Sequence, residues 1–253
     1  MDIDIDSLSR RGRDLTLRYP HGLLTPGTIA AHARRTDTRR HLLNIFSTLH
    51  NDPVDAWRAD FLRTGLALYG PDWDFLDNLC VTHSFARLAR PKRVLEIGVR
   101  TGMCTAAVAA VCPDAELHLI DLWMEGYGGQ HNAGEAFVQK QLVACGHRGP
   151  VHFHSGDSHA QLPALFAAQP ELRFDLILVD GDHTESGAYQ DLRDTLPRLA
   201  PGGLLVFDDV AHSAYRHLLP LWRACILQLG TAVRPMEYLD HGHGVAFALR
   251  STF

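Results

Sequence analysis

A strand, a glycine turn and a helix of small residues follow one another over residues 93–110, and this stretch constrains the fold most strongly. The apolar run at 94–97 is typical of a strand buried on both faces. Gly98 and Gly102 bracket a tight turn, after which the segment 105–110 suits a helix packed closely on a sheet. Glycine lets the backbone approach a ligand, and a helix start offers free N–H groups. The stretch therefore predicts a nucleotide-type cofactor site.

The spacing of the glycines narrows the kind of cofactor. A dinucleotide fingerprint reads G-x-G-x-x-G, whereas Arg100 here takes the place of the middle glycine and leaves G-x-x-x-G. An acid, Glu96, stands two residues before Gly98. This E-x-G-x-x-x-G pattern resembles motif I of the class I S-adenosylmethionine (SAM) methyltransferases, and it suits a cofactor without a pyrophosphate. The alternative is a plain strand-to-helix turn in another α/β protein.

The composition argues against several classes of function. The formal net charge is −5, so no basic balance points to nucleic acid or to an anionic membrane as a partner. The five cysteines are odd in number and contain no C-x-x-C pair, which argues against a disulfide framework and a structural zinc site. The acidic N-terminus lacks the apolar core of a signal peptide, and no apolar run approaches the ~20 residues of a membrane span. We expect a cytoplasmic protein.

Residues 1–90 are expected to form an N-terminal helical region that contributes to the substrate site. The first 20 residues look poorly ordered or draped over the rest. Aromatic residues of this region, such as Trp57 and Phe61, fall on a helical stripe. They could be core residues or could line a substrate pocket, and a core position is the favoured interpretation for any single one. Expected helices begin at Thr25-Pro26, within 38–50, at Asp52-Pro53 and at Pro71-Asp72.

From residue 91 strand-like and helix-like segments alternate, which predicts a parallel sheet with helices on both faces. Strands are expected at 94–97, 116–120, 151–157, 174–180 and, after a turn at 201–203, 204–209. Helices are expected at 133–146, 158–169 with Ser158 as N-cap, 185–200 with an early end at Pro197, and 212–230. The strands 231–239 and 245–250 form an antiparallel hairpin around a glycine-bearing link. The fold class is α/β, with a doubly wound, seven-stranded, mostly parallel sheet. Residues 91–253 would be a SAM-binding methyltransferase domain.

In an open α/β sheet the ligand lies beyond the carboxyl ends of the strands. Asp121 ends the second strand 19 residues after Gly102, where an acid can accept hydrogen bonds from both ribose hydroxyls. The resemblance to class I methyltransferases implies a SAM site at this edge, with residues 157 and 158 at its adenine end. The cofactor-binding residues it implies are Glu96, Gly98, Thr101, Gly102, Asp121, Asp157, Ser158 and Asp180.

Three carboxylates follow the fourth and fifth strands. Asp180 ends the fourth, and Asp208 and Asp209 end the fifth. Neighbouring parallel strands would bring these acids together, and like charges in one cleft repel one another unless a cation lies between them. Oxygen-only ligation suits Mg²⁺ or another divalent cation. His183 follows Asp180 by three residues, so a short turn can aim it into the same pocket.

This constellation resembles the metal-dependent O-methyltransferases of the catechol and caffeoyl-CoA type. It is still more similar to the bacterial natural-product and sugar O-methyltransferases, in which VDGDH followed by a DD pair recurs. The resemblance implies that Asp180, Asp208 and Asp209 bind the metal and that His183 is the general base, where the catechol type has a lysine. Asp209 departs from the plant and animal enzymes, which often have Asn there. The implied activity is SAM-dependent, Mg-dependent methylation of a hydroxyl on a small molecule, a natural product or its sugar.

Other interpretations stay open. They are a metal-independent SAM methyltransferase acting on nitrogen or carbon, an NAD-dependent Rossmann oxidoreductase and a non-catalytic partner subunit of the same fold. His212 fits a surface position at a helix start, and roles for it, His241 and His243 in the pocket are undecided. Substrate identity and oligomeric state are also undecided. Specificity is expected to come from residues 1–90 and from the loop 123–135.

Overall fold

The computed structural model describes residues 24–127 and 131–252. The first 20 residues, for which a draped or poorly ordered course was expected, lie outside the described residues. So do residues 128–130 of the loop that follows the second strand. Within the described parts of the chain, every helix is too short or too polar to cross a membrane.

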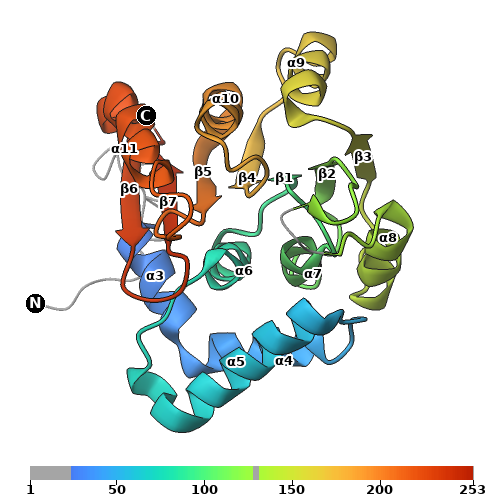
Figure 1. Cartoon of the computed structure of the whole chain (residues 1–253), viewed down its shortest axis with the longest axis vertical. Helices are drawn as coiled ribbons and strands as arrows, with labels where there is room; N and C mark the ends of the chain where they lie inside the picture. Colours follow the sequence, from blue (N-terminus) through green and yellow to red (C-terminus); the bar gives the residue numbers. More distant parts are fainter. Residues whose placement is uncertain (1–23, 128–130, 253) are drawn as a thin grey trace, which may run out of the picture.

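A seven-stranded sheet forms the centre of the molecule, with the strand order β3-β2-β1-β4-β5-β7-β6 (Figure 1). Strands β1 to β5 run parallel to one another, and β7 runs antiparallel to both β5 and β6. The strands are β1 (Arg93–Ile97), β2 (Glu116–Asp121), β3 (Val151–Ser155), β4 (Phe174–Val179), β5 (Leu199–Asp208), β6 (Val233–Tyr238) and β7 (Val245–Arg250). The order reverses between β1 and β4, where ligands bind in sheets of this kind. The expected fold class is confirmed.

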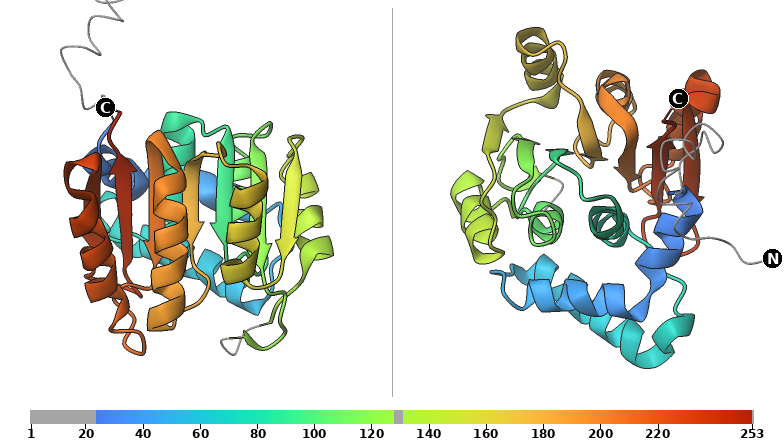
Figure 2. Two further views of the ribbon diagram at one scale, coloured as in Figure 1. Left: turned by 90° about the horizontal axis from the view of Figure 1, so that it is seen from above. Right: turned by 180° about the vertical axis from the view of Figure 1, so that it is seen from behind.

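Helices cover both faces of the sheet. Figure 2 (left) shows α9, α10 and α11 across one face, and Figure 1 shows α6, α7 and α8 on the other, with α4 and α5 outside them. These helices are α6 (Asn78–Ala89), α7 (Met103–Ala109), α8 (Glu135–Ala144), α9 (Ser158–Ala168), α10 (Glu185–Thr195) and α11 (Leu218–Leu229). The N-terminal helices are α3 (Pro26–Arg34), α4 (Thr36–Phe46) and α5 (Pro53–Tyr69). One apolar core extends from α3 and α4 through α6 and α7 to the sheet, so the helical region packs directly on the strands.

Local capping explains where the N-terminal helices begin. Thr25 accepts a hydrogen bond from the amide of Thr28 at 3.0 Å, and Pro26 is the first helical residue of α3. Asp52 caps α5 in the same way through the amide of Asp55 at 2.8 Å. Side-chain caps of this kind satisfy N–H groups that have no partner within the helix. The starts predicted at Thr25-Pro26 and Asp52-Pro53 are confirmed.

The helix expected from Pro71 begins seven residues later, at Asn78. Residues Gly70–Asp72 form a short 3-10 turn (η1), and the chain then runs extended to the N-cap Asp77. The buried Arg39 explains the difference, because its guanidinium donates to the carbonyl oxygens of Trp73 at 2.9 Å and Phe75 at 2.7 Å. Those carbonyls would otherwise point along a helix.

Three further expectations are corrected. The N-cap of α9 is Asp157 and not Ser158, because the Asp157 carboxylate accepts from the amide of residue 159 at 2.9 Å. Strand β5 begins at Leu199, and the predicted turn at 201–203 is an irregularity within it, where the register to β4 shifts. Helix α11 begins at residue 218, so Pro220 lies in its first turn, where its missing N–H is not needed.

The remaining short turns complete the layout. The expected end of α10 before Pro197 is confirmed, since a 3-10 turn, η3 (Leu196–Arg198), follows it. A second such turn, η4 (Gly230–Ala232), joins α11 to β6. All five cysteines are free, as expected from their number and spacing.

Candidate active site

A cavity of about 1620 Å³ lies at the carboxyl ends of β1, β2, β4 and β5. Helix α5 and the segment 72–78 line its other side. Every residue predicted for cofactor, metal or catalysis lines this cavity, with the exception of Gly102. The sheet edge predicted from the sequence therefore borders this cavity.

The turn after β1 has room only for glycine at its first position. Gly98 has a φ of +84°, and a Cβ added there would lie 1.9 Å from the carbonyl oxygen of Asp180. Gly102 also has a positive φ, +74°, and a Cβ would approach the Val138 side chain to 2.9 Å. Gly98 thus permits the ends of β1 and β4 to approach closely, and Gly102 permits the turn to pack against α8.

Arg100 joins the turn to the helical region. In the sequence it is notable only because it replaces the middle glycine of the dinucleotide pattern. Its φ is +52°, a left-handed conformation that is uncommon for a side-chain-bearing residue. Its guanidinium donates to the carboxylates of Asp52 and Asp55 at the start of α5. Asp55 is fully buried, and burial raises the pKa of its carboxyl group against the opposing charge of Arg100. No sequence pattern predicted this contact, because Asp55 and Asp52 lie 45 and 48 positions before Arg100.

Glu96 lies buried beneath the turn. Its carboxylate accepts a hydrogen bond from the hydroxyl of Thr105 in α7. Burial, followed by the charges of Asp180 and Asp121, raises the pKa of Glu96 well above its usual value. The surroundings of Glu96 thus disfavour its charged form. Thr101, also buried, lines the same part of the cavity.

Asp121 lies at the end of β2, as predicted, and its carboxylate is already well supplied with donors. One oxygen accepts from the amides of Val99 and Arg100, both at 2.8 Å. The other accepts from the amide of Trp123 at 2.6 Å and the side chain of Asn132 at 3.0 Å. A carboxylate has about four acceptor positions, so a ribose hydroxyl would have to replace one of these donors. The ribose role of Asp121 stays a prediction.

Asp157 and Ser158 begin α9 at the far end of the cavity. The Ser158 hydroxyl donates to Asp191 of α10 at 2.7 Å. Asp191 is buried, and burial raises its pKa to about 6. This contact ties α9 to α10. Ser158 therefore has a packing role in the described structure, and its predicted contact with the adenine end is untested.

The acidic residues that follow β4 and β5 lie close together at the carboxyl ends of the strands. Val179 pairs with Phe207, so the next residues, Asp180 and Asp208, emerge side by side. Burial and then the charge of Asp209 raise the pKa of Asp180 to about 7. The pKa of Asp208 also lies well above its usual value, through burial and then the charge of Asp180. These acids, Asp180, Asp208 and Asp209, are called the acid edge below.

His183 reaches the acid edge from the turn after β4. Its Nε2 atom lies 3.1 Å from Asp209 Oδ2 and 3.7 Å from Asp180 Oδ1. The donor atoms of these three residues lie within 4.8 Å of one another, a spacing that could hold a metal ion. Burial lowers the pKa of His183, but the hydrogen bond to Asp209 and the charge of Asp180 outweigh it, so the pKa is raised. The ring also stacks on Tyr215, with centroids 4.7 Å apart.

Asn78, which sequence reasoning missed, connects the helical region to the acid edge. Its amide nitrogen donates to Asp180 Oδ2 at 3.1 Å and also to Asp208. Its carbonyl oxygen accepts from Arg58 of α5 at 2.8 Å, which also contacts Asp77. Asn78 is the first residue of α6 and fully buried. No motif marks it, since its role depends on residues more than a hundred positions away.

The link between β6 and β7 borders the site. His243 Nδ1 lies 3.2 Å from Asp209 Oδ1, and Ala211 donates its amide to the carbonyl of His243 at 2.7 Å. His212 packs edge-on against His243 with centroids 4.2 Å apart. His212 thus lines the cavity ahead of α11, and the expectation that it begins a helix on the surface is wrong. His241 also lines the cavity.

An aromatic wall faces the acid edge from the helical region. Trp57 and Phe61 of α5 stack with centroids 5.6 Å apart, and Phe61 contacts both Trp73 and Phe75. Trp57 is 63% exposed and Phe61 38%, so the favoured core interpretation is wrong for these two and the pocket-lining alternative describes them. Both line the cavity. An aromatic surface open to the cavity can bind a flat or apolar molecule.

Comparisons with known proteins agree with this layout. A family described as "Methyltransferase domain" matches residues 95–210. Tricin synthase 1 from Oryza sativa subsp. japonica is 30% identical over 146 residues, which are 54% of this chain and 54% of that protein. The chain thus spans about half the length of this curated relative.

Solved structures share the fold. A putative O-methyltransferase from Klebsiella pneumoniae has a TM-score of 0.53 and 20% identity, with 97% of this chain and 98% of that chain covered. The O-methyltransferase TomG from Streptomyces achromogenes, involved in tomaymycin synthesis and solved with SAM, has a TM-score of 0.54 and 21% identity. That match covers 80% of this chain and 92% of TomG.

Proposed function

Residues 95–210 match a family described as "Methyltransferase domain", and from this match we propose that the protein is a SAM-dependent O-methyltransferase of the class I type. The observation that carries the proposal is the acid edge, with His183 beside it, in a cavity that also contains the glycine turn. SAM-bound TomG and other O-methyltransferases share the fold and support the choice of cofactor. An acceptor hydroxyl next to His183 would receive the methyl group.

The residues present fit a divalent cation. Three carboxylates crowd together, and the raised pKa values of Asp180 and Asp208 reflect negative charge that the fold keeps close in a buried place. Oxygen donors of this kind suit Mg²⁺, and Asp180, Asp208 and Asp209 would hold it. When bound, the ion would lower the pKa of the substrate hydroxyl.

In this proposal the substrate hydroxyl replaces Asp209 as the partner of His183 Nε2, and His183 accepts the hydroxyl proton at that nitrogen. An imidazole exchanges protons near neutral pH, which suits a general base. Tyr215 stacks on the ring, and the His183 carbonyl accepts from His217 Nε2 at 2.7 Å, so both the ring and its backbone are held. Such positioning of the base and the acceptor supplies a large part of the rate in transfers of this kind.

SAM, when bound, supplies the electrophilic methyl group. The chain would hold it along the glycine turn, with Gly98 and Thr101 near its centre and Asp157 toward its adenine end. Asp180 belongs to the acid edge, and its backbone lies against Gly98 of the turn. In this proposal Asp180 and Glu96, which both line the cavity, would border the bound cofactor. The adenine and ribose contacts remain part of the proposal.

The aromatic wall supports an acceptor with a flat or apolar body that carries a hydroxyl. Trp57 and Phe61 are exposed to the cavity on the side opposite the acid edge. A hydroxylated natural product, free or carrying a sugar, has this combination of surfaces. The wall belongs to the helical region, which agrees with the expectation that residues 1–90 set specificity.

One observation favours a second candidate, a metal-independent methyltransferase that uses the same His183. The amide nitrogen of Asn78 donates to both Asp180 and Asp208, and so supplies part of the positive potential that a cation would supply. Sensitivity to a chelator separates the two candidates.

The test measures methyl transfer from SAM to a panel of hydroxylated aromatic compounds, with EDTA and with Mg²⁺ restored. We expect EDTA to abolish transfer and Mg²⁺ to restore it. Asp180→Asn and His183→Gln should lose at least about a hundredfold in rate while each still binds S-adenosylhomocysteine in calorimetry.

Asp182→Asn is the matched control, because Asp182 lies in the same VDGDH motif but accepts from the amide of Thr184 at 2.8 Å. It should stay near wild-type activity. Transfer that is insensitive to EDTA, with full activity in Asp180→Asn, would favour the metal-independent candidate. Thermal stabilisation by NAD and none by S-adenosylhomocysteine would reject both.

A further inference from the structure

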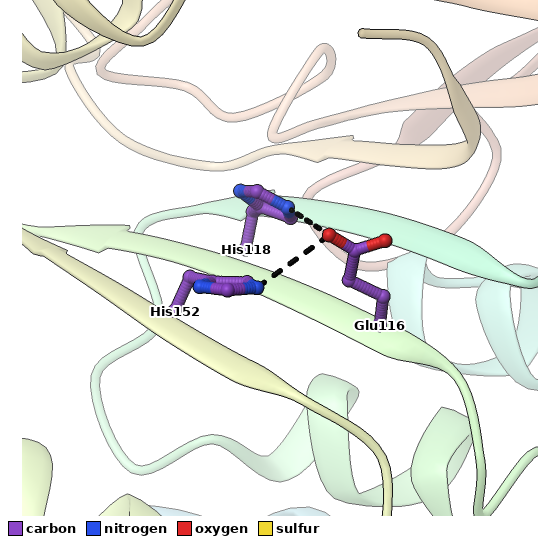
Figure 3. Close-up of side chains that lie close together, drawn as sticks. All are labelled: Glu116, His118 and His152. Atoms are coloured by element: carbon purple, nitrogen blue, oxygen red, sulfur yellow. Dashed lines mark hydrogen bonds and ion pairs between the residues drawn. The ribbon is translucent and has the colours of Figure 1, made fainter. Parts of the chain in front are cut away.

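A second group of metal-ligand side chains lies on the sheet away from the cavity. Glu116 and His118 alternate on β2 and therefore face the same side of the sheet, and His152 of β3 is the register partner of His118. Figure 3 shows both imidazoles directed at the carboxylate of Glu116. None of the three lines the active-site cavity, which opens at the opposite end of the strands.

We propose that Glu116, His118 and His152 form a binding site for a divalent transition-metal ion of the zinc type. His118 Nε2 lies 3.1 Å from Glu116 Oε1, and His152 Nε2 lies 3.5 Å from the same oxygen. All three donor atoms lie within 4.8 Å of one another. Ligands about 2.0 Å from a tetrahedral zinc ion are separated by about 3.3 Å, so small side-chain shifts would seat an ion among them.

The surroundings hold the ligands in place. His118 Nδ1 lies 3.0 Å from His154 Nε2, and Arg93 Nε donates to the second oxygen of Glu116 at 2.8 Å. A ligating histidine usually has its other ring nitrogen in a hydrogen bond, which fixes the ring. In the hydrogen bond to Glu116, His118 donates Nε2–H, and its Nδ1 then accepts from His154 Nε2. The other tautomer, with Nδ1–H donated to His154, would turn the Nε2 lone pair toward an ion bound beside Glu116.

The site is open on one side. His118 is buried, with 1% of its side chain exposed, whereas 28% of Glu116 and 46% of His152 are exposed. An ion can therefore enter from solvent, and water can complete its coordination. Two imidazole nitrogens and one carboxylate oxygen favour zinc over magnesium, which prefers oxygen donors. This preference is the opposite of that proposed for the acid edge.

The experiment titrates the metal-free protein with Zn²⁺ by calorimetry in excess Mg²⁺, which competes for the acid edge. His152→Gln and Glu116→Gln remove exposed ligands and leave the buried His118 in place. We expect each to bind the ion at this site at least tenfold more weakly than wild type. His50→Gln, an exposed histidine outside both sites, is the matched control and should bind like wild type.

Co²⁺ gives a second readout, since its visible absorption bands intensify in a tetrahedral or five-coordinate site. The bands should appear in wild type and in Asp180→Asn, and should be lost in His152→Gln. Equal zinc affinity in wild type, His152→Gln and Glu116→Gln would overturn the proposal. So would absence of zinc binding in wild type, which would leave the cluster as a hydrogen-bond network around Glu116.

Discussion

Arg100 offers the sharpest test of how the helical region and the cofactor turn are joined. Its guanidinium is held by Asp52 and Asp55, and their side chains are 9% and 0% exposed. Arg100→Ala removes the cation and leaves the buried carboxylate of Asp55 without its ion-pair partner. The substitution should destabilise the fold far more than loss of an exposed ion pair would.

The size of the destabilisation by Arg100→Ala follows from the burial of the ion pair. Breaking a buried ion pair costs about 3–5 kcal/mol. Arg100 retains 21% exposure of its side chain, which lets water reach the pair, so the lower end, about 3 kcal/mol, is expected. Arg100→Gly should cost about 1 kcal/mol less than Arg100→Ala, because glycine adopts the left-handed backbone of this position without strain.

The pH dependence has a definite sign. Burial already raises the pKa of Asp55, and loss of Arg100 raises it further. When the pKa of a carboxyl group is higher in the folded state than in the unfolded state, the protein loses stability as the pH rises through the folded-state pKa. The destabilisation caused by Arg100→Ala should therefore be larger at pH 8 than at pH 5.

Urea unfolding at both pH values measures these differences. Arg63→Ala is the matched control, since Arg63 pairs with Asp60 on the surface of α5 with side chains 63% and 72% exposed. It should change the unfolding free energy by less than about 1 kcal/mol. If Arg100→Ala costs no more than Arg63→Ala, the ion pair does not join the two regions.

Two further predictions concern the helical region. Burial lowers the pKa of His83 to about 4. As the pH falls from 7 to 4, the unfolding free energy of wild type should therefore decrease by about 3 kcal/mol more than that of His83→Gln. Urea unfolding should show the gap between the two proteins narrowing with falling pH, and a constant gap would contradict it. Trp57→Ala should raise KM for an aromatic acceptor about two- to tenfold through lost stacking. Its affinity for S-adenosylhomocysteine in calorimetry should not change, and an equal loss of both affinities would show that Trp57 does not contact the acceptor.

Local chemistry explains why much of the fold could be predicted from sequence. The caps at Thr25 and Asp52 act within three residues, so a short window contains everything that fixes the helix start. The sheet was predictable because buried parallel strands need apolar runs, and their carboxyl ends collect the polar residues. The juxtaposition of Asp180 and Asp208 follows from register alone.

The misplaced start of α6 shows where local reasoning fails. Pro71-Asp72 has the chemistry of a helix start, yet the carbonyls of Trp73 and Phe75 accept from Arg39, which lies more than thirty positions earlier. A buried guanidinium in the right place decides the backbone of this segment. The exposed face of Trp57 is a similar case, because only the position of the cavity tells a lining residue from a core residue on the same helical stripe.

Arg100 and Asn78 together show that the site is built from both sides of residue 90, although the secondary-structure pattern of the sequence changes there. Arg100 extends from the glycine turn to the start of α5, and Asn78 extends from α6 to the acid edge. The helical region thus holds the cofactor turn from one side and the acids from the other. The aromatic wall belongs to the same helices, so whatever shifts α5 changes the acceptor surface and the cofactor turn together. Acceptor binding and cofactor binding should for this reason be energetically coupled through α5.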